Sequence, residues 1–180
     1  MKQMLLMCAL ASGCSGFVYA ADSAGAWYIS PLVQWWDLDS ARRATGHVAG
    51  EVTLGYTYDE TWAVEVEGAG ESVASYCGCV LTLAAASLDG LRKFRPGGML
   101  NPYVIAGIGV MHDAVDRSPT STGPTAEVGA GLLGSVGHAA RPVWQWRGEV
   151  KYRREFSDKT ATHSSVGDLI AGLGLQYNFR

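Results

Sequence analysis

The sequence predicts an all-β protein, an eight-stranded antiparallel up-and-down transmembrane β-barrel. The first observation is a strict alternation along residues 144–153, where aromatic, aliphatic and glycine residues occupy the even positions and polar or charged residues the odd ones. Successive side chains of a strand point to opposite faces of a sheet, so this segment has one apolar face and one charged face. Two further observations, the placement of glycines and of large aromatic residues, decide between a membrane barrel and a soluble one.

The first 20 residues have the layout of a secretory signal peptide. Lys2 is followed by an apolar run over residues 4–11 and then by Val18-Tyr19-Ala20, a small-x-small cleavage pattern. We expect cleavage after Ala20 or the next alanine, and export from the cytoplasm. Lipoprotein processing at Cys14 is an alternative, because small residues precede that cysteine.

Residues 21–180 are long enough for one domain, and we assign all of them to the barrel. The net charge of −3 and the lack of a dense basic stripe argue against nucleic acid as a partner. Cys77 and Cys79 are separated by one residue, which makes a disulfide between them geometrically demanding, and no further ligands at zinc-site spacing lie nearby. We therefore expect no cofactor and no metal or redox centre.

The first three strands include the clearest hairpin of the chain. Residues 27–36 alternate in the expected way, although Pro31 weakens this segment as a central strand of an ordinary sheet. Residues 48–58 follow after a polar loop, with apolar side chains on one face and polar ones on the other. A tight turn at residues 59–61 joins them to the alternating residues 62–67, so the pair is typical of a β-hairpin.

The remaining five strands follow the same alternation with one ambiguity. Residues 80–94 contain a run of three alanines that would also suit a helix. We predict a strand there, because Arg95-Pro96-Gly97-Gly98 has turn chemistry and extended character resumes at residues 102–111. The last three predicted strands are residues 125–136, 144–154 and 168–179. Eight strands in about 160 residues leave about twenty residues for each strand and its connection, which suits strands that cross a bilayer at a tilt.

Alternation alone does not separate a membrane barrel from a soluble ligand-binding barrel, because both have two-faced strands. Glycines lie on the polar faces, which favours a narrow lumen shared with long charged side chains; these glycines are Gly55, Gly129, Gly131, Gly172 and Gly174. Large aromatic residues lie near the ends of the apolar faces, where membrane barrels carry interfacial girdles. The candidate membrane-interface aromatics are Trp27, Trp35, Tyr56, Tyr58, Trp62, Trp144, Tyr177 and Phe179.

Several short segments, in the right order along the chain, resemble the transmembrane domain of the outer-membrane protein A (OmpA) family. They are Trp27-Tyr28-Ile29-Ser30-Pro31, Leu54-Gly55-Tyr56, residues 62–68, Ser87-Leu88-Asp89-Gly90-Leu91, residues 101–109, residues 147–153 and Leu173-Gly174-Leu175-Gln176-Tyr177-Asn178-Phe179. The resemblance implies a barrel in a Gram-negative outer membrane, with both termini in the periplasm and four loops outside. It also implies contact with outer-membrane lipid and lipopolysaccharide, and assembly by the barrel-assembly machinery. No linker or peptidoglycan-binding domain follows Phe179, so we expect no tether to the cell wall, and Arg180 extends beyond the terminal aromatic residue at which the assembly signal of such barrels usually ends.

The polar faces, if they point inward, fill the lumen with charge. An eight-stranded barrel is only wide enough for side chains to fill it, and buried charges are tolerated when they are paired. We therefore predict an ion-pair network that plugs the lumen, with Asp89 as a further candidate member. Its residues are Glu51, Glu65, Glu67, Glu127, Arg147, Glu149, Lys151 and Arg153.

The sequence thus favours an exported outer-membrane barrel with a structural or surface-interaction role. Its four predicted loops, residues 37–46, 71–78, 113–122 and 157–165, would meet any surface ligand. A narrow ion or small-solute channel is the main alternative, because rearranged ion pairs could pass small ions. A soluble periplasmic ligand-binding barrel is a further alternative.

Enzymatic activity is not expected. His163 and Ser165, with Asp168 nearby, are reminiscent of lipid A deacylases on barrels of similar size, but Val166 stands where an asparagine would be expected. The segment 129–134 fits the pattern G-x-G-x-x-G, which binds dinucleotides only between a strand and a helix, and no helix is predicted there.

Overall fold

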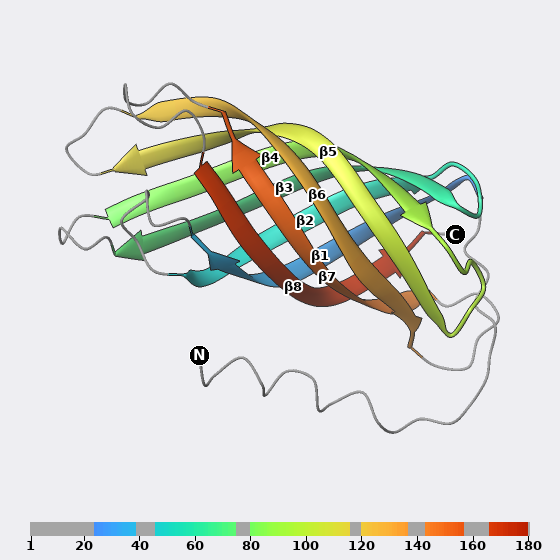
Figure 1. Cartoon of the computed structure of the whole chain (residues 1–180). Helices are drawn as coiled ribbons and strands as arrows, with labels where there is room; N and C mark the ends of the chain where they lie inside the picture. The colour runs from blue at the N-terminus through green and yellow to red at the C-terminus, as the bar shows by residue number, and fades with distance from the viewer. Residues whose placement is uncertain are drawn as a thin grey trace.

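The protein is a closed antiparallel β-barrel, as the sequence predicts. The computed structural model describes residues 24–38, 46–74, 80–115, 120–136, 143–156 and 166–179, and these contain eight strands (Figure 1). The strands are β1 (Ala26–Asp37), β2 (His47–Thr57), β3 (Trp62–Ala74), β4 (Val80–Lys93), β5 (Leu100–Val115), β6 (Ser121–Ser135), β7 (Trp144–Glu155) and β8 (Val166–Asn178). Each strand pairs with its neighbours in the chain, and β1 pairs with β8 to close the sheet. No helix in the described part of the chain is long and apolar enough to cross a membrane.

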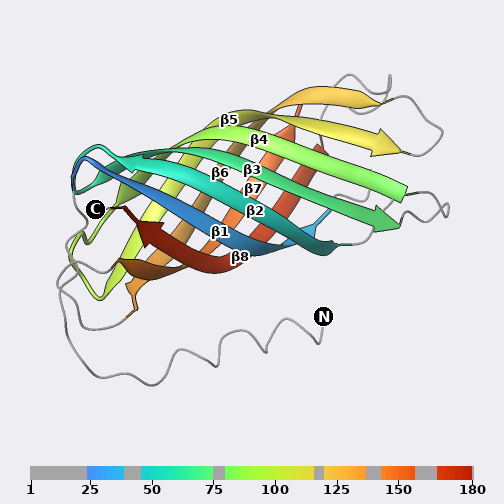
Figure 2. The ribbon, with the colours of Figure 1, turned by 180° about the vertical axis from the view of Figure 1, so that it is seen from behind.

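The two ends of the barrel differ in what they carry. We call the end that holds the start of β1, the end of β8 and the β2–β3 turn the turn end, and the opposite end the loop end. The β2–β3 turn is held by Asp59, whose carboxylate accepts hydrogen bonds from the backbone N–H groups of Thr61 and Trp62, each at 2.7 Å. Figure 2 shows this hairpin and the C-terminus side by side at the turn end.

At the loop end, β3, β5 and β6 extend furthest beyond the strand ends that the sequence predicts. β3 continues to Ala74, β5 continues to Val115 and β6 begins at Ser121, so the prediction of loops over residues 71–78 and 113–122 is wrong at these positions. Some of the added pairs are polar: Ser72 lies opposite Thr82, and the two hydroxyls are 3.2 Å apart on the outer face. Backbone pairing does not need apolar side chains, so apolar alternation underestimates the length of strands that extend into water.

Pro31 lies in β1 without breaking the barrel. The β1–β8 register pairs Ile29 with Tyr177 and Leu32 with Gly174, and it is interrupted between them, where Pro31 lacks the N–H that a ladder requires. The Ser30 hydroxyl donates to the carbonyl oxygen of Leu175 at 3.2 Å, so a side chain replaces the missing backbone donor. The closing seam of the barrel therefore keeps this acceptor satisfied.

Candidate functional site

The inner face of β7 supplies three basic side chains to the middle of the lumen, and Lys93 of β4 is a further buried base nearer the turn end. Gln145, Arg147, Glu149, Lys151 and Arg153 alternate inward, and each side chain is buried. On each of the other strands, every second side chain also faces the lumen. Acids from β2, β3 and β6 therefore surround these bases. The alternation seen in the sequence is thus an inward and outward alternation about the barrel wall.

Arg147 binds two carboxylates and a tyrosine at once. Its Nη1 and Nη2 donate to the two carboxylate oxygens of Glu65 at 2.7 and 2.9 Å, the fork geometry that a guanidinium allows. Its Nε donates to Glu149 Oε2 at 2.9 Å and lies 3.0 Å from the hydroxyl of Tyr103, which itself donates to Glu149 at 2.7 Å. Tyr28 donates a further hydrogen bond to Glu65. This group crosses the lumen from β7 to β3.

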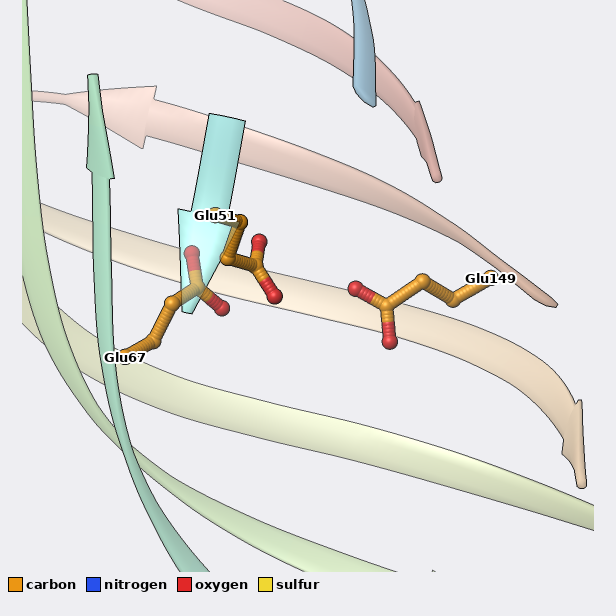
Figure 3. A group of neighbouring side chains, drawn as sticks. All are labelled: Glu51, Glu67 and Glu149. Carbon is orange, nitrogen blue, oxygen red and sulfur yellow. The ribbon is translucent and has the colours of Figure 1, made fainter. Parts of the chain in front are cut away.

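Lys151 lies in a cage of three carboxylates. Its Nζ is 2.8 Å from Glu51 Oε2 and 3.1 Å from Glu149 Oε1, and it forms a third ion pair with Glu67. Figure 3 shows the three carboxylates, from β2, β7 and β3, directed toward the same part of the lumen. Their oxygens lie close enough together to hold a metal ion, but the ammonium group of Lys151 already supplies the positive charge at this position.

Arg153 joins this cage to a second acidic group. Its Nη2 donates to Glu67 Oε1 at 2.6 Å, and its Nε donates to Glu127 Oε2 at 2.6 Å. The Ser87 hydroxyl lies 2.7 Å from Asp89 Oδ2 and 3.1 Å from Glu127 Oε1, so Asp89 enters the network through serine. All eight residues expected in the lumen network are buried there, and each forms at least one ion pair.

Inward-facing glycines make room for these large side chains. Gly131 lies beside Tyr103 in the register, and a Cβ at Gly131 would collide with the tyrosine ring. A Cβ at Gly107 would collide in the same way with the carboxylate of Asp89 on the neighbouring strand. The glycines on the polar faces are therefore a packing requirement of the lumen.

Two apolar clusters lie on either side of the ionic layer, and the sequence analysis did not anticipate them. The cluster nearer the loop end consists of Trp36, Leu38, Ala49, Ala69, Leu81, Leu83, Ala85, Met111 and Ile170. The cluster nearer the turn end consists of Tyr28, Ala63, Leu91, Tyr103, Ile105 and Leu133. The inward parity of Leu81, Leu83 and Leu91 in β4 was the available signal, because these leucines share a face with Asp89.

Trp36 connects the loop-end cluster to the charges. Its Nε1 donates to Gln34 Oε1 at 2.6 Å, and Gln34 in turn donates to Glu51. The guanidinium carbon of Arg153 lies 5.3 Å from the centre of the Trp36 ring, within cation–π range. Buried side chains therefore pack without a break from the loop-end cluster to the ion pairs.

The eight expected interface aromatics all face outward, but they are distributed unevenly. Seven lie at the turn end, and Trp35 alone lies toward the loop end. Their rings form two contacts across strand pairs, Trp27 with Tyr56 at 5.1 Å and Trp144 with Tyr177 at 4.9 Å between centroids. These eight residues therefore form one dense girdle at the turn end, and they do not form a matching girdle at the loop end.

The residues considered for other chemistries do not assemble into a site among the described residues. Asp168 is buried on the inner face of β8 beside Arg153, whereas His163 and Ser165 lie outside the described residues. The segment 129–134 lies within β6, with no helix after it in the described chain, so it lacks the structural context of a dinucleotide site. Cys77 and Cys79 also lie outside the described residues.

The fold resembles several solved structures at low sequence identity. Neisserial surface protein A is 15% identical, with a TM-score of 0.67, and the match covers 85% of this chain and 97% of that one. The N-terminal β-barrel domain of Pseudomonas aeruginosa OprF is 17% identical, with a TM-score of 0.60 and coverage of 88% and 100%. Ail, the attachment invasion locus protein of Yersinia pestis, is 15% identical, with a TM-score of 0.52 and coverage of 87% and 100%.

Sequence comparison leads to the same class of protein. No curated protein matches the chain at a significant level. The family model described as the outer membrane protein beta-barrel domain matches residues 6–179, nearly the whole sequence. With the closed eight-stranded fold and the likeness to outer-membrane barrels, this match shows that the chain belongs to the outer membrane protein β-barrel domain family.

Proposed function

We propose that this protein is a closed outer-membrane barrel with a structural or surface-interaction role. The observation that carries the proposal is the filling of the lumen by three layers of buried side chains, two of them apolar and the middle one ionic. An open water-filled path would have to displace Arg147, Lys151 and Arg153 from their carboxylates, and each separated charge would be costly in this confined space.

The loop end is the part of the molecule that we propose to meet partners. The connections between β1 and β2, β3 and β4, β5 and β6, and β7 and β8 all join strand ends on that side of the barrel. Ail, a structural neighbour, is known in complex with the heparin analogue sucrose octasulfate. By analogy, a surface ligand recognised through these four connections suits the present barrel, with lipopolysaccharide as its surroundings on the outer side.

The N-terminal segment completes the proposal. We propose that residues 1–20 are a signal peptide removed on export, and that the mature chain is delivered to the barrel-assembly machinery. The match to the family and the terminal aromatic pair Tyr177 and Phe179, whose ring centroids are 5.3 Å apart, support this route. Mass determination of the protein purified from outer membranes tests it, because cleavage after Ala20 or Ala21 fixes the mass.

Planar-bilayer recording is the experiment that tests the closed lumen. Purified, folded protein is expected to give no sustained conductance steps, whereas a general porin prepared in the same detergent gives them. A double variant, Arg147→Ala with Lys151→Ala, removes two of the three central bases and is the comparison for any residual leak. Stable open steps in the unmodified protein would overturn the closed-lumen proposal and favour the narrow channel.

A non-enzymatic role is part of the same proposal. Asp168, the acid nearest the His163 and Ser165 pair in sequence, is buried toward Arg153 in the lumen. Overexpression is therefore expected to leave the acylation of lipid A unchanged. A changed lipid A profile that His163→Ala or Ser165→Ala abolishes would contradict this and establish a lipid-modifying enzyme.

A further inference from the structure

Arg92 is exceptional on the outer surface of the barrel. The outward positions of the described strands are apolar or small over most of their length, and their charged residues are Asp37 and Arg154 near the loop end and Arg92 near the turn end. Arg92 lies opposite Trp62 in the β3–β4 register, within the dense aromatic girdle. A charged side chain at this position calls for a physical reason, because it faces the membrane.

Two aromatic rings hold the guanidinium of Arg92 on the outer face. Its central carbon lies 5.5 Å from the centre of the Trp62 ring and 5.6 Å from that of Phe94. These are cation–π distances, which stabilise a guanidinium while leaving its N–H donors free to bind oxygen atoms. Both rings are about half exposed on the same outer face, at 47% and 52%.

No carboxylate of the described residues neutralises this guanidinium. Among those residues Arg92 has ring contacts and no ion pair. The nearby turn acid Asp59 directs its carboxylate to the backbone of Thr61 and Trp62 instead. Arg95, three residues further along the chain, is also exposed and adds positive charge to this corner of the barrel.

The depth of Arg92 matches the level of lipid headgroups. Ten residues separate Thr82, which pairs with Ser72 in the polar outward region, from Arg92 in β4. At about 3.3 Å per residue and a tilt of about 40°, this stretch spans roughly 25 Å along the membrane normal, the height of the apolar band of a membrane barrel. The same ten-residue spacing separates Trp144 from Arg154 on β7.

We propose that Arg92, with Trp62 and Phe94, binds the phosphate of a glycerophospholipid in the leaflet at the turn end. A planar guanidinium pairs with a phosphate diester through two parallel hydrogen bonds, and this phosphate is the anion present at that depth. The rings fix the guanidinium beforehand, which reduces the entropy lost on binding. The inference rests on membrane insertion of the barrel, and it does not depend on whether the lumen conducts or on what the loop end binds.

Native mass spectrometry of the folded protein in detergent tests this site, with dimyristoylphosphatidylglycerol as the titrated lipid. Arg92→Gln is expected to weaken binding of the first lipid about tenfold, because it removes the charge-assisted hydrogen bonds from the guanidinium to the phosphate. Arg95→Gln is the matched control, because it makes the same change of charge without loss of a ring-held guanidinium. It is expected to change the dissociation constant less than about twofold, because Arg95 is exposed and solvent screens its charge.

Two further ligands separate the phosphate of a lipid from other sources of binding. Dimyristoylglycerol, which lacks phosphate, is expected to bind the unmodified protein and Arg92→Gln equally, and millimolar inorganic phosphate is expected not to displace the phospholipid. Equal losses for Arg92→Gln and Arg95→Gln would overturn the proposal in favour of a general charge effect. Equal losses for both lipids, or displacement by inorganic phosphate, would overturn it as well. Heat-modifiable gel migration of each variant establishes that it is folded before the titration.

Discussion

Val150 and Lys151 are consecutive residues of β7 that face two different environments, the outside of the barrel and its lumen. Val150 is 50% exposed on the outer face, with apolar neighbours in the register such as Ala130 and Ala171. Lys151 is fully buried on the inner face and forms ion pairs with three carboxylates. One strand therefore satisfies the requirements of lipid and of a charged lumen at adjacent positions.

The two faces differ in how strictly they specify a residue. The lumen requires particular partners, because Lys151 meets acids contributed by β2 and β3, more than 80 residues earlier in the chain. The outer face requires only apolar character in the middle and aromatic or basic character near the ends. Substitutions inside should thus depend on partners, and substitutions outside should depend on depth.

Lys151→Met is expected to be the most damaging single change, because it leaves Glu51, Glu67 and Glu149 close together without their shared cation. Removal of one partner of a buried ion pair costs roughly 3–5 kcal/mol. Reversible urea unfolding in phospholipid vesicles, followed by tryptophan fluorescence, measures the free energy of unfolding. Adding Glu51→Gln to Lys151→Met should recover part of the loss, because it removes the carboxylate whose ion pair is with Lys151, whereas Glu67 keeps Arg153 and Glu149 keeps Arg147.

Val150→Met is the matched control for this prediction. It introduces the same side chain at the adjacent position, where methionine faces lipid, and should change the free energy of unfolding by less than about 1 kcal/mol. Equal effects of methionine at positions 150 and 151 would show that the ion-pair cage contributes nothing particular to stability.

Val150→Arg is the opposite change to Lys151→Met, because it adds a charge to the outer face instead of removing one from the lumen. Position 150 lies between the interfacial residues Trp144 and Arg154, close to the centre of the apolar band. An arginine near the bilayer midplane costs roughly 2–4 kcal/mol in membrane barrels, and this cost falls toward the interfaces. Phe156→Arg, directly after the loop end of β7, should therefore cost less than half as much, as measured by the same unfolding assay. A loss independent of depth would contradict the assignment of the outer face to lipid.

Gly131→Ala tests the packing of the lumen without any change of charge. A methyl group there would collide with the Tyr103 ring and with the backbone of Gly148, so the expected loss is about 1–3 kcal/mol, typical of overpacking. Gly68→Ala on the outer face of β3 is the control, because a Cβ at that position meets nothing within 4 Å. Equal unfolding free energies for the two alanine variants would contradict the idea that lumenal glycines are required for space.

Alternation in the sequence predicted the eight strands and the direction of their charged side chains, because both follow from local periodicity. It did not predict which acid meets which base. Arg147 contacts Glu65 across 82 positions of sequence, and this pairing depends on barrel width and register, which periodicity does not encode. The apolar clusters were not predicted, because inward leucines such as Leu83 share their face with charged residues. Some strand ends were not predicted, because pairing continues through polar residues such as Ser72.

The uneven girdle could have been predicted from the sequence, because the up-and-down topology already gives the direction of each strand. Antiparallel strands present their starts and their ends alternately at one end of the barrel. Trp27 at the start of β1 and Tyr177 near the end of β8 therefore lie at the same level. Only the direction of each strand shows that seven of these eight residues share one end.

Asp59→Asn compares a charge in water with the charges of the lumen, and it should have the smallest effect. Hydrogen bonds from the side chain and backbone of Thr61, followed by the backbone of Trp62, lower the pKa of this exposed carboxyl below its usual value. A lowered folded-state pKa means that the charged form adds stability above the unfolded pKa, and that this stability is lost as the pH falls through the folded pKa. Asp59→Asn should therefore be slightly less stable than the unmodified protein at about pH 7, and the difference should shrink as the pH falls through the lowered folded-state pKa of Asp59. Glu60→Gln in the same turn is the control for loss of charge, and a pH-dependent difference of equal size in that variant would show that the hydrogen bonds of Asp59 are not its cause.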